Sequence, residues 1–201
     1  MKRLYLMRHG QTMFNLQKRI QGWCDSPLTQ AGCDQARTAG RKLAERGVVF
    51  DHAYASTSER ACDTLELVLE GMGAGEPGST QPLLAYGRER GIKEMSYGEL
   101  EAMPERLANN DPKACETYYL QFGGESSNTV RDRMVATLTN IMEREGHKTV
   151  LAVSHGGAAF NFLRAIQDPT EELKRGWGNC TTCIYTYEDG RFQLEEVIRP
   201  C

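Results

Sequence analysis

The stretch Leu4-Tyr5-Leu6-Met7-Arg8-His9-Gly10-Gln11-Thr12 changes from an apolar run to a charged turn. An apolar run this short predicts a buried β-strand. Arg8 and His9 then fall at its carboxyl end, which in an open parallel sheet is the edge where ligands bind. Gly10 permits a sharp turn or a close backbone approach at that point. The stretch therefore predicts a strand that places an arginine and a histidine at a site. The alternative is a histidine that is hydrogen-bonded in an ordinary loop, because so short a sequence fits both.

Composition favours one globular domain over residues 1–201, with 40% hydrophobic and 25% charged residues. The net charge of −3 and the pI of about 5.9 suggest neither a nucleic-acid nor a membrane partner. No apolar stretch approaches the roughly 18 residues that cross a bilayer. The N-terminus lacks the apolar core of a signal peptide, so we expect a cytoplasmic protein. We expect either a monomer or a homodimer.

The cysteines are scattered and odd in number, which favours free thiols in a reducing compartment over a disulfide framework. Cys180 and Cys183 form the one CxxC pair, at the start of a β-branched and aromatic run. Residues three apart on a strand point to opposite faces, which argues against a shared metal or a redox role.

After the first strand, the chain alternates between helical and extended patterns. Thr29 is a suitable cap for a helix that ends near Arg46, and Ser58 for a second helix with a buried apolar face. Between them, residues 48–55 resemble a strand. This alternation predicts a parallel sheet with right-handed crossovers.

The later part of the chain continues this pattern after a less regular segment. Residues 83–86 form a possible short strand, and residues 94–125 mix weak helical pieces (99–109 and 113–120) with prolines, as in an insertion that forms a lid. The remaining expected elements are a helix capped by Ser126 or Ser127 and ended by Gly146, a strand over 149–153, a helix around 160–166, and strands 181–187 and 192–198 joined by Asp189-Gly190.

Two strands end in the same way. Ser154-His155-Gly156 follows the most apolar strand, as Arg8-His9-Gly10 follows the first, so both histidines should emerge at one edge of the sheet. Arg60 lies in the first turn of its predicted helix, beside N–H groups that favour anions. Two arginines, two histidines and a helix N-terminus predict a site for a tetrahedral dianion such as phosphate.

Such a site suits phosphoryl transfer through histidine. At an unperturbed pKa of about 6.5, a histidine is substantially neutral near pH 7 and can attack phosphorus. Fixed positive charge then stabilises the transferring group. An acid must protonate the leaving oxygen, and Glu94 is the candidate, because a nearby dianion would raise the pKa of its carboxyl. A solvated surface charge is the alternative interpretation of Glu94.

The ordered motifs resemble the histidine phosphatase superfamily, in its phosphoglycerate-mutase-like branch. The resemblance covers nearly the whole chain and rests on the following segments: Arg8-His9-Gly10-Gln11-Thr12, Asn15, Gln21-Gly22-Trp23, Asp25-Ser26-Pro27-Leu28-Thr29 with Gly32, Ser56-Thr57 with Arg60-Ala61 and Thr64, Glu94 with Tyr97-Gly98 and Glu101, Gly123-Gly124-Glu125-Ser126, and Ser154-His155-Gly156-Gly157.

The resemblance implies a three-layer α/β/α sandwich and a site without metal or cofactor. It implies that His9 is phosphorylated and that Glu94 donates a proton and later activates water. Residues implied to hold the phosphoryl oxygens are Arg8, Arg60 and His155. Residues implied to bind the substrate are Asn15, Gln21, Gly22, Tyr97 and Gly156.

Departures from the family pattern bear on the reaction. Ala102 follows Glu101 where many relatives have glycine, and residues 103–122 lack the paired arginines that mutases carry. We therefore expect a phosphatase that hydrolyses a small phosphorylated metabolite, with a bisphosphate-dependent phosphoglycerate mutase as the alternative and a non-catalytic phospho-ligand binder as a third reading. The basic residues Arg88, Arg90 and Lys93 either bind a second acidic group or belong to a solvated loop.

Overall fold

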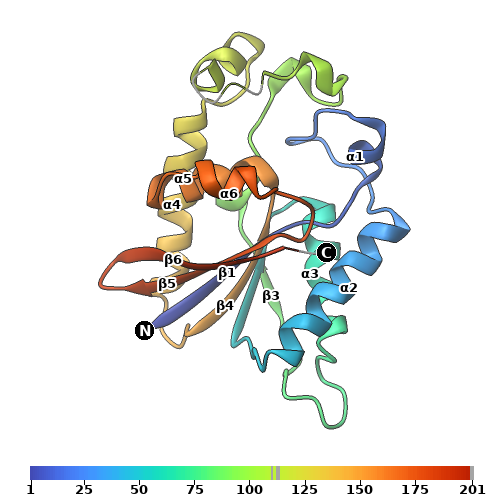
Figure 1. Ribbon diagram of the computed structural model, residues 1–201, viewed down its shortest axis with the longest axis vertical. Coiled ribbons are helices and arrows are strands. Elements are labelled where there is room, and N and C mark those ends of the chain that lie inside the picture. Colours follow the sequence, from blue (N-terminus) through green and yellow to red (C-terminus); the bar gives the residue numbers. More distant parts are fainter. Residues whose placement is uncertain (110, 112–113, 200–201) are drawn as a thin grey trace.

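One mixed sheet runs through the computed structural model, which describes residues 1–109, 111 and 114–199 (Figure 1). Its strands are β1 (Lys2–Arg8), β2 (His52–Ala55), β3 (Tyr86–Arg88), β4 (Thr149–Ser154), β5 (Thr182–Glu188) and β6 (Arg191–Ile198), and the helices are α1 (Met13–Gln17), α2 (Gln30–Glu45), α3 (Glu59–Gly71), α4 (Ser127–Glu143), α5 (Gly156–Ile166) and α6 (Thr170–Lys174). The strands lie in the order β3-β2-β4-β1-β5-β6. The pairs β1–β4, β2–β4 and β2–β3 are parallel, whereas β5 and β6 are antiparallel. The predicted parallel sheet with a C-terminal hairpin is confirmed.

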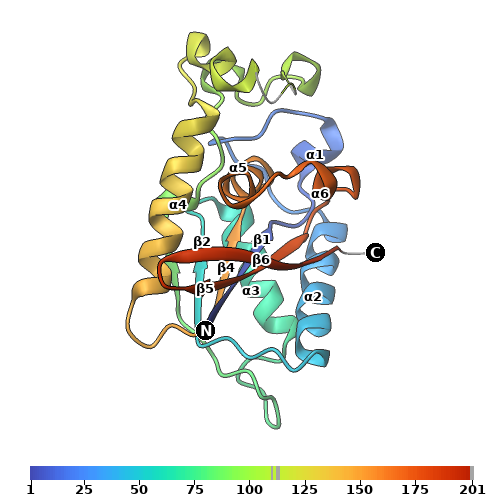
Figure 2. The ribbon, with the colours of Figure 1, turned by 60° about the vertical axis from the view of Figure 1, so that its left-hand side comes forward.

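Helices cover both faces of this sheet, as Figures 1 and 2 show. Side chains of β1 alternate between two cores, which explains why its apolar run is continuous. Leu4 and Leu6 pack in the core beneath α4 and α5, whereas Tyr5 and Met7 pack beneath α2 and α3. The α/β/α sandwich is thus confirmed.

The two cysteines of the CxxC pair also lie in different cores. Cys180 lies in the α2–α3 core and Cys183 in the α4–α5 core. Burial raises the pKa of each thiol to about 12. Both side chains therefore act as small apolar groups of the core.

Strand β2 is shorter than the predicted 48–55. The Phe50 backbone is hydrogen-bonded on both sides by the Gln81 amide, whose Oε1 accepts from Phe50 N and whose Nε2 donates to Phe50 O. The Gln81 side chain thus makes the hydrogen bonds that a neighbouring strand would make, and β2 begins only at His52. Strand β3 likewise begins at Tyr86 rather than Leu83, because Leu83 is exposed and has no core to enter.

The insertion contains short 3₁₀ turns in its described part. They are η1 (Arg90–Ile92), η2 (Gly98–Leu100), η3 (Glu105–Leu107), η4 (Ala114–Glu116) and η5 (Tyr118–Phe122). The prediction of longer helical pieces over 99–109 and 113–120 was wrong for the residues that the structure describes. Residue 113 is not among the described residues. Figure 1 shows the insertion above the edge at which β1 and β4 end.

Other helices also differ from the prediction in their presence or in their end points. Helix α1 was not among the predicted helices, and Thr12 and Asn15 form a reciprocal capping box at its start. Helix α5 begins at Gly156, earlier than its apolar pattern, α4 ends at Glu143 before Gly146, and α6 was not predicted. In the residues described, no helix has the length and apolar character needed to span a membrane.

Candidate active site

Two buried imidazoles meet at the carboxyl edge of the sheet. Arg8 pairs with Ser154 in the parallel β1–β4 register, so His9 and His155 each follow by one residue. Their ring centroids are 5.3 Å apart at an interplanar angle of 63°, and the two residues are 4% and 0% exposed. The sheet register therefore brings together two histidines that are far apart in sequence.

The local backbone orients the His9 ring and sets which of its nitrogens carries the proton. Its Nδ1 lies 2.8 Å from Gly10 O, and because a carbonyl oxygen only accepts, Nδ1 carries the proton and Nε2 keeps its lone pair. A Cβ on Gly10 would lie 2.6 Å from Gly32 O, so only glycine allows this turn to pack against α2. Burial, with the charges of Arg60 and Arg8, lowers the pKa of His9 well below its usual value.

The ring of His155 is held from β2. His155 Nε2 lies 2.7 Å from Ser56 Oγ, which also accepts from Ser58 N–H at 3.4 Å and so has its own proton free to donate. Nδ1 is then the protonated nitrogen, and it is buried without a partner among the described residues. Burial, with the charge of Arg60, lowers the pKa of His155. The ring is a neutral donor with one N–H to offer.

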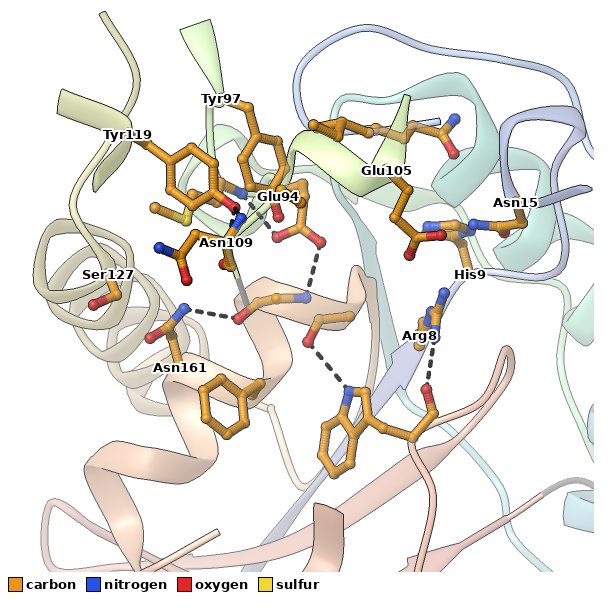
Figure 3. Close-up of a pocket in the computed structure, with 18 of the residues that line it drawn as sticks. Arg8, His9, Asn15, Glu94, Tyr97, Glu105, Asn109, Tyr119, Ser127 and Asn161 are labelled. Atoms are coloured by element: carbon orange, nitrogen blue, oxygen red, sulfur yellow. Dashed lines mark hydrogen bonds between the residues drawn. The ribbon is translucent and has the colours of Figure 1, made fainter. Parts of the chain in front are cut away.

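Arg8 lies beside the start of α5. Its Nη1 donates to Trp177 O at 2.6 Å, and its Nε is buried with no partner in the described part of the chain. A Cβ on Gly156 would lie 3.3 Å from that Nε, so glycine leaves room there. Figure 3 shows the Arg8 side chain close to His9. Trp177 was not singled out by the sequence.

Arg60 is fully buried and largely occupied by the chain itself. Its Nη1 donates to Cys24 O and Asp25 Oδ1, and its Nη2 to Gly22 O, at 2.8 to 3.0 Å. Its Nε has no partner among the described residues. The expectation that the N-terminus of this helix offers its N–H groups to a ligand was wrong in part, since Glu59 N–H donates to Asp25 Oδ2 at 2.6 Å.

Glu101 fixes the loop that holds Arg60. Its carboxylate accepts from the backbone N–H groups of Gly22, Trp23 and Cys24 at 2.8 to 3.0 Å. With the N–H groups turned toward Glu101, the carbonyls of the same loop point toward Arg60. Gly22, predicted to bind substrate, thus lies behind the guanidinium.

Glu94 is buried at 5% exposure, so its interpretation as a solvated surface charge was wrong. Its Oε1 accepts from Met95 N–H and its Oε2 from Gly157 N–H, at 2.8 and 2.9 Å. Burial is the main cause that raises the pKa of this carboxyl. Arg133 of α4 anchors the segment by donating to Lys93 O and Glu94 O. Because its pKa is raised, this carboxyl keeps its proton to higher pH than a free carboxyl does, which a proton donor needs.

Arg8, His9 and Glu94 border a cavity of about 440 Å³ (Figure 3). The sequence-predicted residues on its wall are Arg8, His9, Asn15, Gln21, Glu94, Tyr97 and Gly156. Arg60, His155 and Gly22 are not on that wall. Wall residues that the sequence did not indicate include Asn109, Tyr119, Ser127, Asn161, Arg164 and Trp177.

Asn15 is tied to the loop that carries His9. Its Oδ1 accepts from Thr12 N–H at 3.1 Å and from Asn179 Nδ2 at 3.2 Å, while Asn179 also donates to His9 O. Gln21 belongs to the same network, because its Oε1 accepts from Thr12 Oγ1 at 2.7 Å. Both side chains support the loop that carries His9.

The basic residues before Glu94 lie elsewhere. Arg90 and Lys93 stack over the Trp23 ring, at 5.3 and 4.7 Å from its centroid, and neither they nor Arg88 line the cavity. Trp23 Nε1 donates to Glu94 O at 3.0 Å. This cluster supports the backbone of the Glu94 segment from outside.

Comparison with known proteins decides the family. The family model described as histidine phosphatase superfamily (branch 1) matches residues 4–199. This chain belongs to the histidine phosphatase superfamily. The resemblance stated from the motifs is therefore confirmed, and the chain is an enzyme of the phosphatase or phosphoglycerate mutase kind.

Superfamily members with high similarity carry different names. A 2,3-bisphosphoglycerate-dependent phosphoglycerate mutase from Bradyrhizobium sp. is 40% identical over 197 residues, covering 90% of both chains. The crystal structure of phosphoglycerate mutase from Bacillus anthracis has a TM-score of 0.80 at 26% identity, covering 96% of this chain and 91% of its own. A phosphoserine phosphatase from Entamoeba histolytica, in complex with 3-phosphoglyceric acid, shares the fold with a TM-score of 0.75 at 24% identity, covering 98% and 96%.

Proposed function

We propose that this chain is a metal-independent phosphatase that hydrolyses a small phosphate monoester through a phosphorylated His9. The observation that carries the proposal is the pairing of a neutral, oriented imidazole with a buried carboxyl. The hydrogen bond to Gly10 O leaves the His9 Nε2 lone pair available, and burial favours the protonated form of Glu94. Nucleophile and acid border the same cavity.

In the first step, His9 Nε2 attacks phosphorus while the bond to the leaving oxygen breaks. That oxygen takes the proton of Glu94, which becomes a carboxylate. Arg8, Arg60 and His155 each keep one buried nitrogen without a partner in the described residues, and these nitrogens are the groups we assign to the phosphoryl oxygens. Positive charge held in place before the reaction lowers the barrier without reorganisation.

In the second step, the Glu94 carboxylate takes a proton from water. The resulting hydroxide attacks phosphorus, the nitrogen–phosphorus bond breaks, and inorganic phosphate leaves. His9 returns to its neutral form and Glu94 to its protonated form. One carboxyl thus acts as acid and then as base.

The cavity wall favours a phosphatase over a mutase. Among the described residues of the insertion, the wall receives a carboxylate, an amide and phenol groups from Glu105, Asn109, Tyr97 and Tyr119, but no basic side chain. A second phosphoryl group would meet no basic group from the described insertion, and the basic wall residues besides Arg8 are the single arginines Arg19 and Arg164. Because a phosphoglycerate mutase is 40% identical to this chain, the mutase remains our second candidate.

An assay of phosphate release and of phosphoglycerate interconversion separates the two functions. We expect phosphate release from several monoesters, unchanged by a chelator, to exceed interconversion of 2- and 3-phosphoglycerate in the presence of catalytic bisphosphate. Faster interconversion than release would establish the mutase instead. If esters bind but none is turned over, the result would favour a non-catalytic phospho-ligand binder.

The pH profile should report the two shifted groups. Burial lowers the pKa of His9, so His9 stays neutral to lower pH than a free imidazole, and it raises the pKa of Glu94, so the acid keeps its proton to higher pH. On the alkaline side, we expect kcat to decline as the pH rises through the raised pKa of Glu94. On the acid side, we expect protonation of His9 to lower kcat only at a pH well below 6.5. The profile is measured with an alkyl phosphate, and Glu94→Gln should remove the alkaline decline. An unchanged decline in that variant would contradict the assignment.

Orthovanadate should inhibit the enzyme competitively with phosphate esters, because its five-coordinate form resembles the transferring phosphoryl group. The unpartnered nitrogens of Arg8, Arg60 and His155 are the expected donors. Steady-state inhibition with a monoester measures this directly. Insensitivity to vanadate would count against a phosphoryl-transfer site.

A further inference from the structure

Two polar side chains on α5 face the cavity beyond the catalytic groups. Asn161 is 3% exposed, and its Nδ2 donates to Gly157 O at 2.9 Å, which leaves Oδ1 buried without a partner among the described residues (Figure 3). Arg164 follows almost one turn later, so it shares this face of the helix. Its Nη2 donates to Asn128 Oδ1 at 3.0 Å, and its Nε is likewise buried and unpartnered. Both residues line the cavity, so the same wall carries an unused acceptor and an unused donor.

The charge of Arg164 is not balanced within the described chain. Among the described residues its one hydrogen-bond partner is the neutral amide of Asn128, and no carboxylate lies within ion-pair distance. Holding a half-buried guanidinium without a counter-charge costs free energy, because the group loses part of its hydration. An anionic group of a ligand would remove that cost.

The spacing along α5 relates this pair to the reacting end of the cavity. Gly157, in the first turn, donates to Glu94. With a rise of about 1.5 Å per residue, Asn161 and Arg164 lie about 6 and 10 Å further along the axis. Helical side chains lean toward the N-terminus, so the two polar groups reach back toward the catalytic end. A ligand group a few bonds from phosphorus would meet them.

We propose that Asn161 and Arg164 form a second subsite that selects phosphate monoesters carrying a carboxylate next to a hydroxyl or ammonium group. Arg164 donates to the carboxylate, and Asn161 Oδ1 accepts from the hydroxyl or ammonium. A single guanidinium matches the single charge of a carboxylate. The inference rests on the proposed function, since the phosphate end must occupy the His9 site.

Binding by the His9→Ala variant tests the subsite without turnover. The probes are O-phosphoserine and O-phosphoethanolamine, which differ by the carboxylate alone, and calorimetry gives each dissociation constant. We expect phosphoserine to bind at least about tenfold tighter, as a charge-assisted hydrogen bond provides. Adding Arg164→Gln should remove that preference and leave phosphoethanolamine binding within about twofold. Adding Arg164→Lys, which keeps the charge, should retain part of it.

Arg131→Gln is the matched control, because Arg131 lies on α4 outside the cavity wall and pairs with Asp132. It should leave both dissociation constants unchanged. Equal binding of the two probes before mutation, or an unchanged preference after Arg164→Gln, would overturn the subsite. Inorganic phosphate binding tests the phosphate site separately, so its failure would count against the proposed function rather than against Arg164.

Discussion

Replacing His9 by alanine should lower kcat/KM for every phosphate ester by about 10⁴-fold or more, because the group that attacks the ester and carries the phosphoryl group to the second step is lost. The fold should survive, since among the described residues the His9 side chain has one hydrogen bond, to the neighbouring carbonyl of Gly10. The variant should still bind inorganic phosphate through Arg8, Arg60 and His155. Steady-state kinetics and calorimetry on the same preparation measure both properties.

A matched control is His52→Asn, at the opposite end of the sheet. The His52 ring stacks on His147 at a centroid distance of 3.6 Å, near the start of β2 and away from the cavity. We expect its activity to match the unmodified protein. Full activity in His9→Ala would remove covalent catalysis by His9 from the account.

The second large effect should come from Glu94→Gln. Removing a general acid lowers the rate by about 10²- to 10⁴-fold when the leaving oxygen needs a proton, as in an alkyl phosphate. The loss should be smaller in the first step for 4-nitrophenyl phosphate, whose phenolate leaves without protonation. Hydrolysis of phosphohistidine still needs the base, so the phosphoenzyme should accumulate with this ester. Rapid-quench kinetics with both esters measures the difference.

Glu99→Gln makes the same chemical change at an exposed position nearby. It should alter neither the rate nor the accumulation. An equal loss on both esters in Glu94→Gln, with no phosphoenzyme burst, would assign Glu94 a structural role. Thermal unfolding of each variant shows whether the fold is retained, since glutamine cannot accept both of the N–H groups that Glu94 accepts.

Much of this site could be predicted because the decisive residues follow from strand geometry. The runs before His9 and His155 are apolar enough to identify buried parallel strands, and parallel strands end at one edge. The two imidazoles accordingly lie 5.3 Å apart. Glu94 had no such signal from strand geometry; the need for an acid suggested it, and the ordered family motifs supported it.

The parts that were missed depend on contacts between distant segments. The Gln81 amide sets the start of β2, and no local pattern encodes that contact. The 3₁₀ turns of the insertion bury no periodic apolar face, so helical spacing was misleading there. Asn161 and Arg164 had a usable signal, since their spacing places them on one face of α5, but the cavity that this face meets is formed by the tertiary structure.

Trapping the covalent intermediate tests the central claim most directly. The protein is mixed with 4-nitrophenyl phosphate, quenched in alkali, where phosphohistidine survives, digested and mapped by mass spectrometry. The account predicts a phosphoryl group on His9 that forms and decays at the rate of turnover, and that is longer-lived in Glu94→Gln. A phosphoryl group on any other residue, or turnover without phosphorylation of His9, would contradict it.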